Sequence, residues 1–215
     1  MSDERVRAFV AVKPAADLRR ACADVAAAGR VLPMRWVRPD SVHLTLKFLG
    51  NVPVDAVPAI HQALRQAAAG LAPFSVVARG LGCFPNTTRP RVLWMGLDDP
   101  RRDLLQLQRR IESTLAAVGI PAAERLFQPH MTLARARRTR PVTELDAFLS
   151  AYRGHTFGHL VVSEIHLMRS DLHAKGAVHI PLHAVALQGS SIQSCHRAKL
   201  LEREGKDVET HSCNS

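Results

Sequence analysis

Apolar residues alternate with polar ones in several short segments and recur at helical spacing in the segments between them. The alternation predicts strands over residues 5–13, 42–50, 73–83, 91–97 and 127–136, a short extended piece over 34–37, and a closing pair over 156–169 and 176–187 around a turn at Gly176. Helical spacing predicts helices over residues 15–30, 54–69, 101–118 and 143–152. The helix over 101–118 is the most clearly amphipathic.

The order of these elements nearly repeats itself. Each half of the chain contains a helix and a strand that carries His-x-Thr-Leu, at residues 43–46 and 130–133. This repetition predicts two similar α+β lobes that face each other across a cleft, built from residues 1–188. Residues 189–215 are polar and almost without large apolar groups, so we expect a disordered C-terminal tail there.

The two His-x-Thr motifs are the candidate chemistry. Side chains alternate between the faces of a strand, so His43 and Thr45 share one face and His130 and Thr132 share another. A single copy arises easily by chance in an alternating strand, but two copies in corresponding places of two half-chains indicate a site.

Two imidazoles in one site suit general acid-base catalysis. Because imidazole titrates near pH ~6.5, one ring can accept a proton while the other donates one. For a phosphodiester, one histidine would take the proton of an attacking water, the other would protonate the leaving oxygen, and the threonine hydroxyls would hold the non-bridging oxygens. A strained cyclic phosphate needs no metal for this step, and we expect no cofactor, since neither H-E-x-x-H nor a carboxylate cluster accompanies the motifs.

Charge and composition narrow the expected binding partners and cellular location. The net charge of +10 and pI near 10.5 favour polyanionic partners such as RNA, although a basic surface alone shows no function. The four dispersed cysteines contain no C-x-x-C, which argues against a disulfide framework or a thiolate zinc site. With no signal-peptide pattern and no apolar stretch of membrane-span length, we expect a cytoplasmic protein without membrane contact. No oligomerisation segment is evident, so we expect a monomer.

The chain resembles the two-histidine phosphoesterase superfamily, in particular the RNA 2',3'-cyclic phosphodiesterases, also called the 2'-5' RNA ligase family. The resemblance rests on RAFVAVKP, HLTLKFLG, GCFPNTTRPRVLWMGL, FQPHMTLAR and SEIHLMRSDLHAKGAVHIPL. It implies a bilobal fold of two antiparallel sheets with outer helices, related by pseudo-two-fold symmetry around a central cleft. It also implies that His43 donates a proton to the leaving 3' oxygen, that His130 activates water, and that the product is a 2'-phosphomonoester. Many relatives carry a tyrosine where this chain has His179.

Several other residues are secondary candidates. By strand parity Lys47 shares the face of His43, where it would add positive charge near RNA, or it is a solvated strand-end lysine. The family often has an arginine at Arg135, whose parity places it with Met131 and Leu133 unless the strand twists or bulges.

The loop over 83–91 and two histidine pairs offer further candidates. Arg89, Arg91 and Phe84 could contact phosphate and stack on a base, or the arginines are only solvated. The pairs His155 with His159 and His179 with His183 have a four-residue spacing that binds zinc on a helix. Here they fall in strand-like segments, so we expect no metal site.

The sequence leaves alternatives open. Ligation of a 2',3'-cyclic end to a 5'-hydroxyl would use the same two histidines, although hydrolysis should dominate in water. A binding module for RNA or nucleotides that kept the fold without turnover is the alternative from another class, and the intact motifs argue against it. A serine hydrolase or a dinucleotide enzyme finds no support, since neither G-x-S-x-G nor G-x-G-x-x-G is present.

Overall fold

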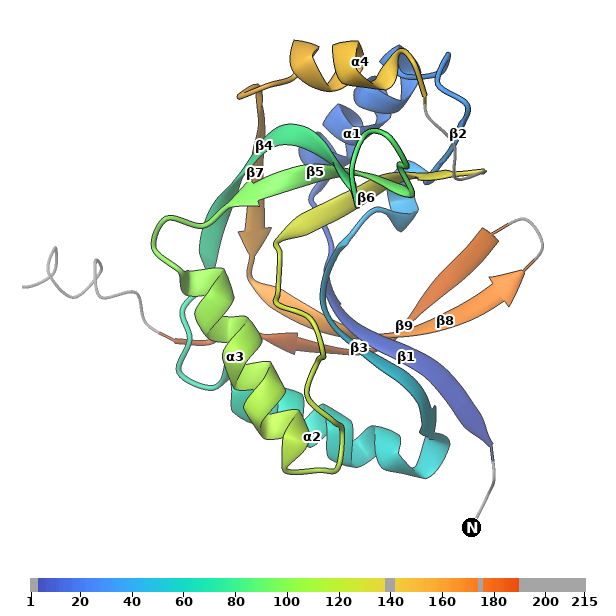
Figure 1. The fold of residues 1–215 in the computed structure, drawn as a ribbon. Coiled ribbons are helices and arrows are strands. Elements are labelled where there is room, and N and C mark those ends of the chain that lie inside the picture. Colours follow the sequence, from blue (N-terminus) through green and yellow to red (C-terminus); the bar gives the residue numbers. More distant parts are fainter. Residues whose placement is uncertain (1–3, 138–141, 174–175, 190–215) are drawn as a thin grey trace, which may run out of the picture.

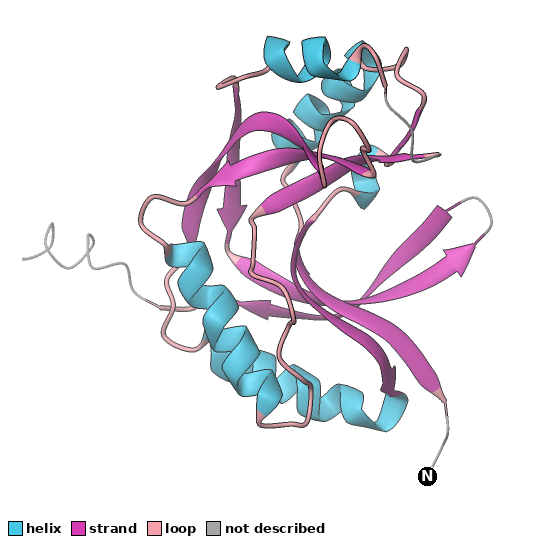
Figure 2. Cartoon of the chain, in the orientation of Figure 1, coloured by secondary structure: helices cyan, strands magenta, loops and turns pink. Residues whose placement is uncertain are grey.

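The computed structural model describes residues 4–137, 142–173 and 176–189, which form an α+β fold (Figures 1 and 2). The strands are β1 (Arg5–Val12), β2 (Met34–Trp36), β3 (Leu44–Pro53), β4 (Phe74–Phe84), β5 (Val92–Asp98), β6 (His130–Ala136), β7 (Thr156–Val162), β8 (Glu164–His173) and β9 (Gly176–Ala186). The helices are α1 (Ala16–Ala28), α2 (Val57–Ala68), α3 (Asp103–Ala116) and α4 (Leu145–Ala151), with short 3-10 turns at Pro39–Ser41 and Val54–Ala56. The expected fold class is confirmed.

The sheet consists of two matching halves. Its strand order is β7-β4-β5-β6-β3-β1-β8-β9, and all the pairings are antiparallel. The halves meet where β3 pairs with β6, and β2 adds to the edge of β6 beyond that point. The two predicted sheets are therefore joined through the two strands that carry the His-x-Thr motifs.

Each half has its own pair of helices (Figure 1). Helices α2 and α3 pack on each other and against β3, β8 and β9, whereas α1 packs against β6 and β7 and α4 against β4. The apolar stripe of α3 is fully buried in the same core as Leu44 and Met131 of the motif strands. Since neighbouring residues in a strand face opposite ways, the helices cover the face of the sheet that points away from the histidines.

Two predicted element boundaries are wrong. The strand expected over 156–169 is two strands, and a break at Ser163 sends β7 to pair with β4 and β8 to pair with β1, in opposite halves. The strand that begins near the first motif continues past Gly50 to Pro53. Gly50 adopts φ +72° beside a register shift between β1 and β3, so it bends the strand without ending it.

The last described residues follow β9, which is the edge strand of the sheet. Gly189 donates its backbone N–H to the carbonyl of Leu71, at 2.7 Å. The tail expected over 189–215 lies, from residue 190 on, outside the described residues. None of the helices in the described part of the chain is long and apolar enough to span a membrane.

Candidate active site

The two His-x-Thr motifs lie side by side in the centre of the sheet. Leu44 of β3 is paired with Met131 of β6, and both are fully buried. Extending this antiparallel register by one residue in each direction puts His43 beside Thr132 and Thr45 beside His130. Directly opposed residues point to the same face, so the two imidazoles and the two hydroxyls share the face away from the core. We call this the histidine face.

Both motif strands carry a β-bulge at the same position. Where β3 pairs with β1, Leu46 has no partner, because Thr45 lies opposite Ala11 and Lys47 opposite Val10. Where β6 pairs with β5, Leu133 is likewise left without a partner. An extra residue in a strand reverses the alternation of side chains beyond it. The leucine that ends each motif is therefore the point where strand parity changes.

The bulge at Leu133 brings Arg135 to the histidine face. In β6, Leu133 and Ala134 are both buried and Arg135 is exposed, the pattern expected when parity shifts by one residue. Arg135 acts electrostatically on His43, His130 and His179, and lowers the pKa of each. The strand parity of a regular β6 would have turned this guanidinium into the core.

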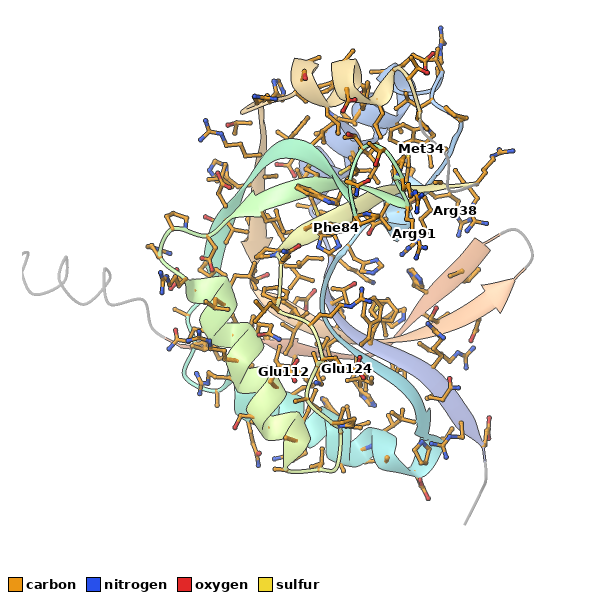
Figure 3. The ribbon with its side chains drawn as sticks, in the orientation of Figure 1. Met34, Arg38, Phe84, Arg91, Glu112 and Glu124 are labelled. Atoms are coloured by element: carbon orange, nitrogen blue, oxygen red, sulfur yellow. The ribbon has the colours of Figure 1, made fainter. Side chains whose placement is uncertain are left out.

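The matching bulge removes Lys47 from the site. The expectation that Lys47 shares the face of His43 is wrong, since its side chain is buried on the core side and the whole residue is only 3% exposed. Its ammonium group pairs with Glu112, which is labelled on α3 in Figure 3, and donates to the carbonyl of Pro121 at 2.8 Å. Glu112 also accepts the backbone N–H of Ala123 at 3.3 Å. Lys47 thus ties β3 to α3 and to the segment that leads into β6.

The same type of backbone contact orients both imidazoles. Nδ1 of His43 lies 2.8 Å from the carbonyl of Ser41, and Nδ1 of His130 lies 2.7 Å from the carbonyl of Gln128. A carbonyl only accepts, so each Nδ1 carries the proton. Each neutral ring therefore keeps Nε2 free to take a proton from a ligand, and each charged ring has an Nε2–H to give.

Aromatic rings support the first histidine from β1 and β9. The rings of His43 and His179 lie 4.9 Å apart in a T-shaped contact, and Phe9 lies 4.9 Å from His43 and 5.0 Å from His179. Phe9 belongs to β1 and His179 to β9, so both come from the half of the sheet that holds His43. No pattern in the sequence indicated Phe9, and His179 was noted only as a departure from the family and as one of a histidine pair weighed as a zinc site.

The second histidine has its own aromatic wall. Phe84 lies 5.0 Å from the ring of His130 in a T-shaped contact, and Trp94 lies 6.4 Å from it. Trp94 is paired with Thr132 and lies opposite Gly82 on β4. A Cβ at Gly82 would come within 2.3 Å of the indole ring, so the glycine makes room for Trp94. Phe84 is thus beside the site, as its sequence neighbourhood suggested.

Burial and nearby basic groups lower the pKa of both imidazoles. Burial is the largest effect on His43 and lowers its pKa to about 4; the hydrogen bond to Ser41 opposes this shift, whereas His179, Arg135 and His130 add to it. Burial also lowers the pKa of His130, against the hydrogen bond to Gln128 and together with Arg135. In the free protein both rings are therefore neutral at pH 7. An arriving anion would reverse much of this shift, because it stabilises the charged rings.

The remaining sequence candidates lie around or beyond this cluster. Arg89 and Arg91 are exposed on the β4–β5 loop, whose ends are joined by the N–H of Arg91 and the carbonyl of Phe84 at 2.7 Å (Figure 3). His183 stacks on His61 of α2, with ring centroids 4.2 Å apart, so it is separated from His179. His155 packs against Phe157 outside the site.

A groove of about 410 Å³ lies elsewhere, on the exposed side of α3. It is lined by Arg101, Arg102, Leu105, Gln106, Arg109, Arg110 and Ser113. None of the expected site residues lines it, so the open pocket and the paired motifs are separate features.

Known proteins share this fold and sequence. The family described as LigT like Phosphoesterase matches residues 10–94 and 96–179. A Thermus thermophilus protein named RNA 2',3'-cyclic phosphodiesterase is 37% identical over 193 residues, covering 86% of this chain and 91% of that protein. An Aquifex aeolicus protein of the same name is 33% identical over 156 residues, or 72% of this chain and 82% of that protein.

Solved structures agree with these matches. A crystal structure of a Thermus thermophilus protein superposes with a TM-score of 0.72 at 30% identity and covers 86% of this chain and 100% of that one. A crystal structure of Escherichia coli LigT complexed with 3'-AMP has a TM-score of 0.68 at 27% identity, covering 86% and 99%. The resemblance drawn from the paired motifs is confirmed, and the chain belongs to the LigT-like family of two-histidine phosphoesterases.

Proposed function

We propose that this protein hydrolyses terminal 2',3'-cyclic phosphates of RNA to 2'-phosphomonoesters, with His43 as proton donor and His130 as proton acceptor and without a metal ion. The observation that carries the proposal is the β3–β6 pairing, which sets two imidazoles and two threonine hydroxyls on one exposed face. The curated relatives named RNA 2',3'-cyclic phosphodiesterase support the substrate, as does the complex of Escherichia coli LigT with 3'-AMP.

The chemistry follows from the free Nε2 atoms. His130 takes a proton from water as its oxygen bonds to phosphorus, and the bond from phosphorus to the 3' oxygen breaks while His43 gives that oxygen its proton. Thr45, Thr132 and Arg135 hold the non-bridging oxygens, where negative charge builds up. The assignment of donor and acceptor follows the family, since both rings are held by a backbone carbonyl in the same way.

Substrate binding favours the protonated form of His43 that the donor role needs, and the proton itself comes from solvent. His43 is neutral at pH 7 in the free protein, because burial, helped by repulsion from His179, Arg135 and His130 when they are charged, holds its pKa at about 4. A bound phosphate is an anion beside this ring and raises that pKa, which charges the donor only when substrate is present. Arg135 is then paired with the same anion and no longer opposes the charged ring.

The test is turnover of an oligoribonucleotide that ends in a 2',3'-cyclic phosphate, with EDTA present. We expect a 2'-phosphate end from the unaltered protein and none from His43→Ala or His130→Ala. An inert protein would favour the RNA-binding alternative, and variants that remain active would contradict the roles of the two histidines. Addition of a 5'-hydroxyl oligonucleotide reports ligation, which would appear as a longer product with a 2'-5' linkage. Cytoplasmic location and a monomeric state stay predictions from the sequence.

A further inference from the structure

Two arginines stand directly opposite each other at the end of the histidine face. Arg35 on β2 is paired with Arg135 on β6, so their Cβ atoms are neighbours and their side chains point to the same face. On either side of Arg35, Met34 and Trp36 face the core, where Met34 is buried and Trp36 contacts Phe148. The alternation along β2 therefore independently places Arg35 on the side of Arg135.

This arrangement costs stability unless an anion is bound. Like charges that face each other across two strands repel. Neither guanidinium has an ion pair or hydrogen bond with any residue in the described part of the chain, although other arginines, such as exposed Arg101 and half-buried Arg169, are paired with aspartates. Arg35 and Arg135 are both exposed, so a ligand can reach them.

The two arginines act on different groups of the site. Arg135 acts on all three imidazoles of the histidine face, whereas Arg35 acts on Arg135 alone among these groups. Arg135 follows Thr132 by three residues, which corresponds to about 10 Å along a strand. Its long side chain can extend back along the strand toward the histidines. Arg35 lies on the neighbouring strand, at the same edge of β6 as β3, and three residues before Arg38, the cation that acts on His179. A phosphate held by Arg135 at the histidines leaves Arg35 facing the next group along the ligand.

We propose that Arg35 binds the phosphate on the 5' side of the terminal nucleotide, one step along the RNA from the cyclic phosphate that Arg135 and the histidines hold. This inference rests on the proposed function and adds a second phosphate subsite to it. A guanidinium suits the role, since its planar fork can hold two phosphate oxygens. The protein therefore prefers an RNA end, or a nucleotide with a 5'-phosphate, to a nucleoside 2',3'-cyclic phosphate.

The test compares two small substrates that differ by this one phosphate, adenosine 2',3'-cyclic phosphate with and without a 5'-phosphate. We expect kcat/KM to be about tenfold higher with the 5'-phosphate, the effect of one charge-assisted hydrogen bond. Arg35→Gln should lose this preference and keep its activity on the substrate without the 5'-phosphate. Arg35→Lys, which keeps the charge but not the fork, should keep part of the preference. Arg30→Gln is the matched control, because it removes an equal charge from an exposed residue that follows α1 and belongs to neither β2 nor β6.

A dinucleotide pair separates the phosphate from base contacts. An adenylyl dinucleotide with a terminal cyclic phosphate is compared with the same molecule carrying a neutral methylphosphonate linkage. The unaltered protein should favour the charged linkage, and Arg35→Gln should treat both alike. Two results would overturn the subsite and leave the proposed function standing. One is turnover without any preference for the added phosphate, and the other is an equal loss of activity on all substrates in Arg35→Gln. Absence of turnover on every substrate overturns both.

Discussion

The two motif strands are built alike up to the bulge and differ beyond it. In each, a histidine is held by a backbone carbonyl two residues before it, a threonine follows on the same face, and the fourth residue is a bulged leucine. Beyond the bulge, β3 continues with buried Lys47 and exposed Phe48, whereas β6 continues with buried Ala134 and exposed Arg135.

This difference suggests that the shared part of the two strands serves the acid-base chemistry and that the residues beyond the bulge serve ligand recognition. The shared part supplies a pair of equivalent imidazoles, which is what acid-base catalysis requires. The fifth residue after the histidine faces the site in both strands, but it is a guanidinium in one and a phenyl ring, 68% exposed, in the other. We therefore expect a ligand with an anionic end and an aromatic base to place the anion near Arg135 and the base near Phe48.

The largest effect is expected from the shared part of the motifs. His43→Ala and His130→Ala should each lower kcat on the order of 10²- to 10⁴-fold. Because donor and acceptor act on one transition state, the double variant should be little slower than the slower single variant. Rates on a cyclic nucleotide measure this, with His155→Ala as a histidine control outside the site. Independent, multiplying losses would argue against a joint mechanism.

The next effect is on stability and affects only the β3 side. Lys47→Met should lower the free energy of unfolding by about 3 kcal/mol, because Glu112 and the Pro121 carbonyl lose their buried partner. Urea denaturation measures it, and the double variant with Glu112→Leu should recover part of the loss. A change in the free energy of unfolding below about 1 kcal/mol would mean that the Lys47–Glu112 ion pair does not hold β3 to α3.

The charged half should set the pH dependence. Both imidazoles have lowered pKa values in the free protein, so kcat/KM should peak below pH ~6.5, the ordinary titration point of imidazole. Arg135→Gln removes a cation that lowers both values, so the peak should move to higher pH, and KM should rise about tenfold. Arg109→Gln on α3 loses the same charge and should leave the profile in place. A peak that does not move would disconnect Arg135 from the histidines.

The smallest effect is expected in the apolar half. Phe48→Ala should raise KM for a cyclic nucleotide about fivefold if the exposed ring stacks on the base, a contact worth about 1 kcal/mol. Phe48→Tyr keeps the aromatic face and should bind normally. An equal KM for all three proteins would show that Phe48 is merely exposed.

Much of the site could be predicted from local sequence. The alternation around His43, Thr45, His130 and Thr132 placed each pair on one strand face, and the repeat of the motif indicated two facing lobes. The strand-face assignment agrees with the β3–β6 pairing, because a regular strand has a period of two that needs no knowledge of its neighbours.

The sequence determined by itself which residues are paired as His-x-Thr, which segments are helices and that the fold is α+β. Only the tertiary structure decided that Arg135 enters the site and Lys47 leaves it. A bulge arises from the pairing of two strands, and the sequence of a single strand does not show where it will form. It also decided that residues 156–169 divide between the two halves, and that Arg35 meets Arg135. Each of these depends on pairing between distant segments, where one residue of register reverses every side chain beyond it.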